Sequence, residues 1–162
     1  MMRGRMGRGV RLLGGLMALV SCCALAGGPP PDKPVSVDDA RAMRALETAM
    51  TPYVAQARRT WPDARAKFLA GLPADQRFYV TARLHDDRGT TEQVFVAVRS
   101  VRDGRIEGRI ASEILSVRGY RVGDAIEIDE AALIDWTISH ADGIEEGNVV
   151  GKFLDTWSPP TR

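Results

Sequence analysis

The two histidines, His85 and His140, are the residues of this sequence best suited to metal binding or acid–base chemistry. Acidic side chains stand close to each of them in the sequence, namely Asp86, Asp87, Asp135, Asp142 and Glu145. Two imidazoles and a carboxylate can hold a divalent metal, which would support a metal-dependent hydrolase. No pair of these residues has a spacing that forces the ligands together. We therefore expect no metal site and no cofactor, and keep a hydrolase or metal-binding protein that uses His85 and His140 as an alternative.

Nucleophilic catalysis has no convincing set of residues either. Ser139, His140 and Asp142 have the types found in serine hydrolases, but adjacent residues of a strand point to opposite faces of a sheet. The sequence contains no P-loop, no GxGxxG fingerprint and no HExxH pattern. We therefore expect no catalytic residue.

The N-terminal part of the chain has the three-part form of a secretory signal. Residues 3–11 carry four arginines, and residues 12–20 form a short apolar run. That run is too short to cross a bilayer as a permanent helix. Cys22 and Cys23 follow it and are the only cysteines, so no disulfide framework can stabilise the fold.

The segment Leu19-Val20-Ser21-Cys22 resembles the box at which bacterial lipoproteins are cleaved and acylated. We therefore expect residues 1–21 to be a lipoprotein signal peptide and Cys22 to carry the lipid, which anchors the protein to the membrane. Because Cys23 is not an aspartate, we expect the outer membrane, with the protein facing the periplasm. The alternative is a secreted protein that is cut near Ala24 or Ala26.

Residues 22–35 are rich in glycine and proline, which is typical of a tether, and residues 36–158 are expected to form a single domain. Four of the 22 basic residues lie within 1–21, which leaves 18 basic against 21 acidic residues. A net negative charge argues against nucleic acid as a partner, because phosphate binding needs a basic face. We expect an envelope protein or a peptide instead.

The first part of this domain has the spacing of amphipathic helices. Apolar residues recur every three or four positions from Val37 to Ala57, after a capping hydroxyl at Ser36. Pro52 and Pro62 each remove a backbone donor, and Gly71 marks a helix end. The pattern therefore predicts more than one helix before position 71.

The period changes to two after Arg77, which indicates strands. Residues 78–84 alternate between two faces, whereas residues 94–98 are apolar on both faces, as in a central strand. Asp103-Gly104 predicts a two-residue hairpin turn. Gly108 indicates a bend or a close approach of two backbones.

Two more strands follow the Gly123-Asp124 turn. Residues 125–128 alternate in and out, and a short turn separates them from a strand that carries Trp136. Helices followed by about five strands define an α+β fold with an antiparallel sheet. We expect this sheet to be strongly curled, or to form an SH3-like partial barrel.

Five short motifs of the strand region occur in this order: Phe78-x-Val80, Glu92-x-Val94-Phe95-Val96-x-Val98, Gly104-x-Ile106-x-Gly108, Gly123-Asp124-x-Ile126 and Ile134-Asp135-Trp136. Together they resemble the DUF2314 family, a bacterial domain of unknown function, some of whose members are short exported proteins. The resemblance covers about Ala55 to Phe153. It implies no established reaction, cofactor or catalytic residue.

The family pattern also repeats Asp124 and Asp135-Trp136, for which we expect structural roles. Asp124 can bond the backbone amides of its own turn, and Trp136 can fill the inside of the curled sheet. The alternative is that Trp136 or Tyr120 lines a groove that binds a ligand such as a peptide or a glycan.

These observations lead us to expect a lipid-anchored protein of the bacterial cell envelope with a non-catalytic binding or scaffolding domain. Two alternatives stay open. One is the envelope hydrolase or metal-binding protein that uses His85 and His140. The other is an inhibitor or immunity-type partner of a secreted protein.

Overall fold

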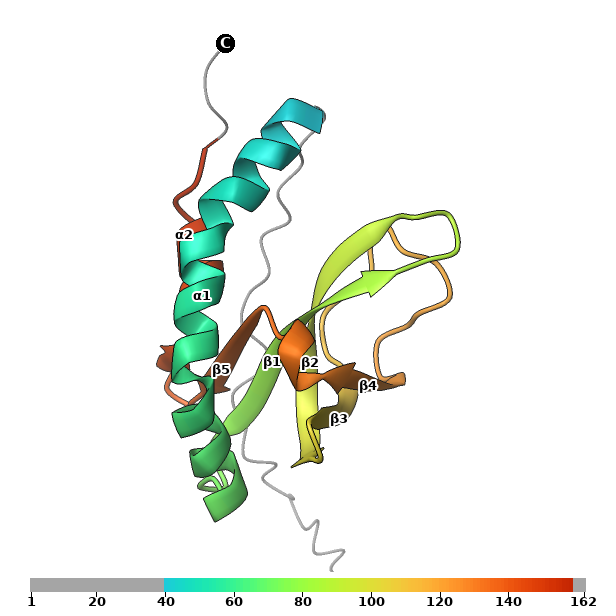
Figure 1. The fold of residues 1–162 in the computed structure, drawn as a ribbon. Helices are drawn as coiled ribbons and strands as arrows, with labels where there is room; N and C mark the ends of the chain where they lie inside the picture. Colours follow the sequence, from blue (N-terminus) through green and yellow to red (C-terminus); the bar gives the residue numbers. More distant parts are fainter. Residues whose placement is uncertain (1–39, 159–162) are drawn as a thin grey trace, which may run out of the picture.

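In the computed structural model, which describes residues 40–158, one long helix lies beside an antiparallel sheet of six strands (Figure 1). The elements are α1 (Ala40–Ala70), β1 (Arg77–His85), β2 (Thr91–Arg102), β3 (Arg105–Ile110), β4 (Ala125–Asp129), the 3-10 turn η1 (Glu130–Ala132), β5 (Asp135–Ser139), β6 (Glu145–Gly147) and α2 (Val149–Leu154). The strand order is β4-β3-β2-β1-β5-β6. The α+β class and the central position of β2 are therefore confirmed.

The helix α1 is continuous over 31 residues, so the expectation that prolines divide it is wrong. Pro52 and Pro62 both lie on its exposed side, where water can solvate the carbonyls that lose their partners. The buried stripe on the other side keeps its spacing across both prolines and contains Leu46, Met50, Ala57, Trp61 and Ala64. Burial of this stripe outweighs the local cost of the prolines. The predicted helix start at Ser36 lies outside the described residues.

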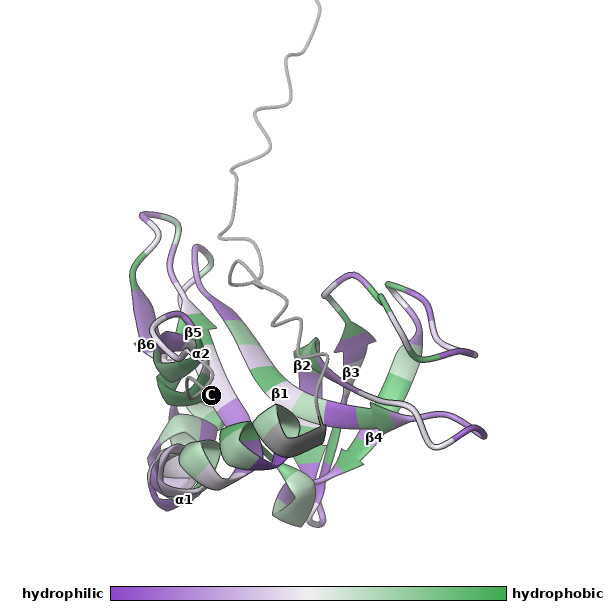
Figure 2. Ribbon diagram, turned by 90° about the horizontal axis from the view of Figure 1, so that it is seen from above, coloured by the Kyte–Doolittle hydropathy of each residue, from purple (hydrophilic) through white to green (hydrophobic). Residues whose placement is uncertain are grey.

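The sheet is open, so the expectation of a strongly curled sheet or an SH3-like partial barrel is wrong. In the described part of the chain, β4 and β6 lie at opposite edges, and there are six strands, where we expected about five. Part of the apolar face that a barrel would cover with its own strands is covered here by α1 (Figure 2), and Val117 and Leu133, from the segments before β4 and β5, join the same core. An alternating sequence shows that a strand face is buried but does not show what buries it.

Aromatic stacking joins α1 to the sheet. The ring of Phe78 on β1 lies between two rings of α1, with centroids 5.8 Å from Trp61 and 5.1 Å from Phe68. Trp61 also donates a hydrogen bond from Nε1 to Glu130 of η1, at 3.0 Å. These contacts fix the C-terminal half of α1 against the sheet, whereas its N-terminal half extends past the end of β5.

The backbones of β2 and β3 approach each other at Gly108, as the sequence predicts. A Cβ at this position would lie 2.4 Å from the carbonyl oxygen of Ala97 and 2.6 Å from Cγ1 of Val96. The register of the two strands shifts beside it, between Val98 and Ser100. The bulge and the glycine together bend this side of the sheet.

Candidate ligand-binding groove

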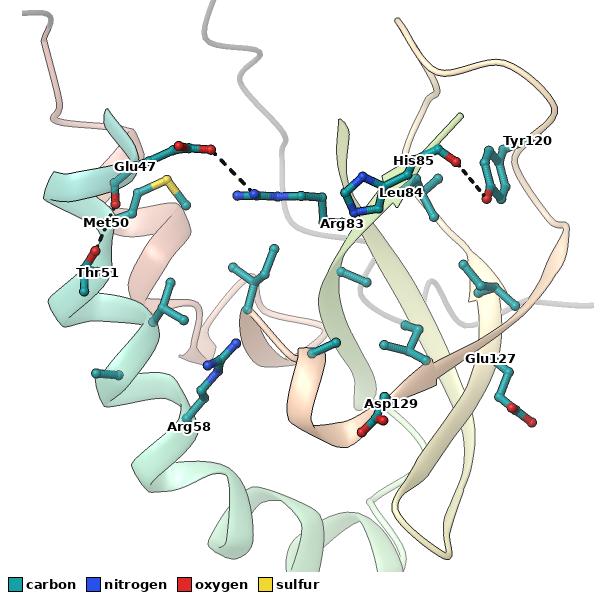
Figure 3. A pocket seen from close by; sticks show the side chains of 17 residues that line it. Glu47, Met50, Thr51, Arg58, Arg83, Leu84, His85, Tyr120, Glu127 and Asp129 are labelled. Atoms are coloured by element: carbon teal, nitrogen blue, oxygen red, sulfur yellow. Dashed lines mark hydrogen bonds and ion pairs between the residues drawn. The ribbon is translucent and has the colours of Figure 1, made fainter. Parts of the chain in front are cut away.

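A groove with a volume of about 1050 Å³ separates the N-terminal half of α1 from β1 and β4 (Figure 3). Its apolar lining comes from both sides and includes Met50, Val54, Ala82, Leu84, Ile126, Ile128 and Ile134. Polar side chains surround this apolar surface. An apolar surface with a few polar groups at its rim is the usual composition of a ligand site.

The groove exists because β5 is shorter than β1. Their ladder runs only from Arg77–Ser139 to Thr81–Asp135. The rest of β1, residues 82–85, therefore has β2 on one side and the groove on the other. The described strands leave this edge of β1 unpaired.

Most charges around the groove are already paired. Arg83 forms an ion pair with Glu47 of α1 at 3.5 Å, and Arg105 donates to Glu127 at 2.8 Å. Arg58 differs, because its Nε donates to the carbonyl oxygen of Leu133 at 2.8 Å. No carboxylate of the described residues forms an ion pair with Arg58.

The loop between β3 and β4 closes one end of the groove and is held by two carboxylates. Glu92 of β2 accepts hydrogen bonds from the N–H groups of residues 115–117, at 2.7 to 3.0 Å. Asp86 accepts from the N–H of Arg118 in this loop, at 3.3 Å, and from the N–H groups of Arg88 and Thr90 in its own turn. Both acceptors belong to the β1–β2 hairpin, so the loop is tied to the same strands that form the groove.

Tyr120 lines the groove, as one of our sequence-based alternatives requires (Figure 3). Its hydroxyl donates to the carbonyl oxygen of His85 at the end of β1, at 3.2 Å. The ring is half-buried, which leaves part of it accessible to a ligand.

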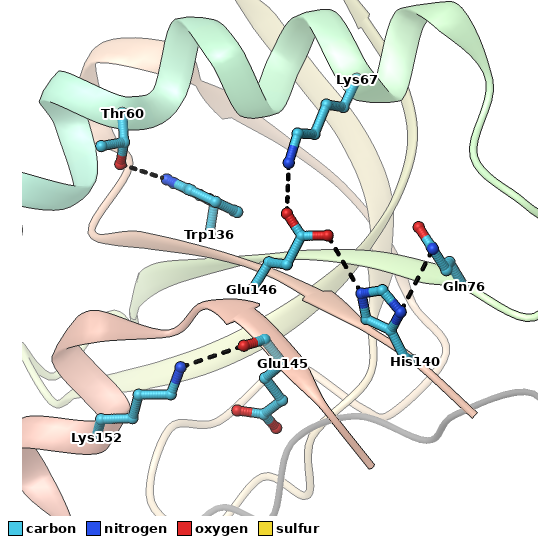
Figure 4. A network of polar contacts seen from close by, with 8 residues as sticks. All are labelled: Thr60, Lys67, Gln76, Trp136, His140, Glu145, Glu146 and Lys152. Atoms are coloured by element: carbon cyan, nitrogen blue, oxygen red, sulfur yellow. Dashed lines mark hydrogen bonds and ion pairs between the residues drawn. The ribbon is translucent and has the colours of Figure 1, made fainter. Parts of the chain in front are cut away.

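Trp136 lies outside the groove and is 8% exposed. Its Nε1 donates to Oγ1 of Thr60 on α1 at 3.0 Å (Figure 4), and its ring belongs to the core between α1 and the sheet. The structure therefore places Tyr120 and Trp136 in different environments. Asp124, the other residue singled out from the sequence, accepts a hydrogen bond from the N–H of Arg121 in its own turn, at 2.8 Å.

Sequence reasoning missed the residues that α1 contributes to the groove. Met50 and Arg58 face β1 and η1 across it (Figure 3). Arg58 and the carbonyl that it bonds are 75 residues apart in the chain, so no local spacing links them. The available signal was an arginine beside the apolar stripe of a predicted helix, which is common on helices without a site.

Asp135 is fully buried and joins β5 to α2. Its carboxylate accepts from the N–H of Trp136 at 2.8 Å and from the N–H of Val150 in the first turn of α2 at 2.6 Å. Burial raises its pKa to about 6, although these amide groups and Lys152 favour the ionised form. A carboxylate at this place holds α2 against the sheet and does not face the groove.

The two histidines lie at opposite ends of β1. His85 ends β1, whereas His140 follows Ser139, which pairs with Arg77 at the start of β1. A strand of this length spans about 26 Å. No group of three His, Cys, Asp or Glu side chains that could hold a metal occurs among the residues that the structure describes. The two imidazoles therefore cannot share one metal ion.

His140 takes part in a polar network at the far end of the sheet (Figure 4). Its Nε2 lies 3.2 Å from Oε1 of Glu146, and its Nδ1 lies 3.4 Å from Nε2 of Gln76. Lys67 of α1 pairs with the other oxygen of Glu146, and this hydrogen bond lowers the pKa of Glu146. The network ties the C-terminal end of α1 to β6.

These features define a class: a small α+β domain with an open antiparallel sheet and a groove of ligand size beside its long helix. Within the described range 40–158, no helix has the length and apolar composition needed to cross a membrane. The model of the DUF2314 family, described as an uncharacterized protein conserved in bacteria, matches residues 43–161. The chain belongs to this family, as the ordered motifs indicated. Neither the curated proteins nor the solved structures contain a match.

Proposed function

We propose that this protein is a non-catalytic binding module of the bacterial cell envelope, which holds its ligand in the groove between α1 and β1. The observation that carries this proposal is the groove itself, which runs along an unpaired strand edge and has a mostly apolar lining. The stability of the fold does not require a groove of this kind in an apolar surface. Recognition of a ligand does require one.

The groove also has the rigidity that binding requires. Its α1 wall is held by the stacked rings of Phe78, Trp61 and Phe68 on one side. On the other side Tyr53 of α1 stacks on Phe153 of α2, with centroids 4.4 Å apart. A preformed site loses little conformational entropy when a ligand binds.

A bulky side chain on the α1 wall should block the groove without disturbing the core. Ala55 is exposed and lines the groove, so Ala55→Trp should fill it. Ala66→Trp, at an exposed position of the same helix outside the groove, is the matched control. The probe is a library of small amides, indoles and carboxylic acids. Binding of each fragment is measured by the shifts of the methyl NMR signals of Met50 and Leu84.

We expect fragments to shift these signals in the original chain and in Ala66→Trp, and to lose binding by at least about tenfold in Ala55→Trp. Fragments that shift only the surroundings of His140, or that bind both tryptophan variants equally, would contradict the proposal. So would a library in which no fragment binds.

The envelope part of the proposal rests on the sequence before residue 36. The basic and apolar regions and the box Leu19-Val20-Ser21-Cys22 support lipidation of Cys22 and attachment to the outer membrane, with the domain in the periplasm. Cys22 lies outside the described residues.

Cys22→Ser should remove the lipid acceptor, and the protein should move from the membrane fraction to the soluble fraction of the envelope. Cys23→Ser is the matched control, because it changes the adjacent thiol and leaves the box intact. Fractionation of cells and labelling with a fatty-acid analogue measure both effects. If Cys22→Ser stays membrane-bound and labelled, lipidation at this residue is wrong.

A further inference from the structure

The unpaired edge of β1 has one set of backbone groups that face the groove. Neighbouring residues of an antiparallel strand direct their N–H and C=O groups to opposite sides. The carbonyl oxygen of Thr81 accepts from the N–H of Ile134, on the β5 side. Two residues further, Arg83 must therefore direct its N–H and C=O to the same side, where β5 is absent.

The partner strand confirms this direction. Phe95, which stands opposite Thr81, accepts from the N–H of Ala111 beyond β3 and donates to Oγ of Ser112. Its backbone groups therefore point away from β1. Gln93, two residues along and opposite Arg83, has the same direction. The backbone of Arg83 is thus available to a strand in the groove.

From this edge we propose that the groove takes the carboxyl-terminal segment of a partner protein, bound as an extended strand antiparallel to β1 with its terminal carboxylate at Arg58. The inference rests on the proposed function and names the ligand class. Strand addition supplies backbone hydrogen bonds from the edge, and the apolar lining receives alternate side chains.

The direction of the added strand follows from β5. Because β5 is antiparallel to β1, a ligand strand with the same orientation runs from the His85 end of the edge toward Ile134. Ile134 already bonds Thr81, so the added strand cannot continue there. About four residues fit along residues 82–85, and the last of them ends beside Leu133.

The charge of Arg58 favours a carboxyl-terminal chain end where the added strand stops. Arg58 bonds the carbonyl oxygen of Leu133 through Nε, at the point where the added strand must stop. Its guanidinium group lines the groove (Figure 3), and no carboxylate of the described residues pairs with it. A terminal carboxylate would give this cation a charge-assisted hydrogen bond. An internal peptide segment would have to turn away and would place no terminal charge there.

The test uses the full chain and a display library of random peptides with free carboxyl ends. Enriched peptides are synthesised as free acids and as C-terminal amides, and their affinities are measured by fluorescence anisotropy. We expect amidation to weaken binding by about tenfold or more. In Arg58→Gln the acid and the amide should bind equally, and Arg58→Lys should restore part of the preference for the acid.

A second measurement leaves the protein unchanged. N-methylation of the peptide, one residue at a time, removes single backbone donors. Methylation of the peptide residue opposite Arg83 should weaken binding, whereas methylation of the residues on either side should not. The reason is that only every second donor of an added strand faces β1.

Equal affinities of acids and amides for the original chain, or equal effects of N-methylation at every residue, would overturn the inference. Preferred binding of a peptide that copies residues 23–39 would assign the groove to the chain's own N-terminal segment and would overturn it as well. If fragments bind in the groove but no peptide is enriched, the inference is wrong and the proposed function stands. If neither binds, both are wrong.

Discussion

Gly147→Ala should lower the free energy of unfolding by about 2 to 5 kcal/mol. Gly147 has a φ of +74°, which costs about 1 to 2 kcal/mol for a residue with a side chain. A Cβ would also lie 2.3 Å from the carbonyl oxygen of Trp136 and 2.7 Å from its ring. Relief of that overlap must move β5 or the indole, and overpacking of this kind costs about 1 to 3 kcal/mol.

Gly143→Ala is the matched control for this change. Gly143 has a φ of +84°, but a Cβ there would have nothing within 4 Å. Gly143→Ala should therefore lower the free energy of unfolding only by the backbone cost of about 1 to 2 kcal/mol. Urea unfolding followed by tryptophan fluorescence measures both variants. Equal destabilisation would show that Gly147 does not lie against Trp136 in the way described.

Asp135→Asn should remove the loss of stability that Asp135 causes as the pH rises from 4 to 7. Burial raises the pKa of Asp135 from 3.8 to about 6 in the folded state. The folded protein therefore binds more protons than the unfolded chain in this window, and the group lowers stability as the pH rises. The difference between the two pKa values corresponds to about 3 kcal/mol. An asparagine cannot ionise, so the free energy of unfolding of wild type minus that of the variant should fall by about 2 kcal/mol from pH 4 to 7, and the rest of the difference falls below pH 4.

Other carboxylates act in the opposite direction and cancel in this difference. The Lys67 hydrogen bond lowers the pKa of Glu146, and hydrogen bonds from Ser100 and Arg102 lower that of Glu107. Their contributions are lost as the pH falls, in both proteins alike. Asp75→Asn, at an exposed position, controls for the loss of one acidic residue. If the difference between the free energies of unfolding of wild type and Asp135→Asn stays constant from pH 4 to 7, the buried position of Asp135 is contradicted.

The sequence predicts those parts of the fold that depend on short-range patterns. The alternation in β1, the two apolar faces of β2 and the Asp103-Gly104 turn each lie within a few residues, and all three are confirmed. By contrast, β6 has three residues and α2 has six, which is too short to show a period of two or of 3.6. α2 forms because Asp135, on another element, bonds its first turn.

The remaining differences arise from tertiary packing. A proline has a local cost that the sequence shows, whereas the burial that offsets it in α1 depends on a sheet formed later in the chain. The groove has the same origin. Tyr120 could be named because aromatic rings outside the core often line ligand sites, but Arg58 became a candidate only when Leu133 was placed beside it.

Amide hydrogen exchange of the isolated chain tests the open edge of β1 most directly. The N–H groups of Ala82 and Leu84 face β2 and should exchange slowly, whereas the N–H of Arg83 faces the groove and should exchange much faster. Arg83 lies between the other two, so all three share the same local stability. Equal protection of the three amides would show that the edge is already covered and would contradict the binding site proposed for this protein.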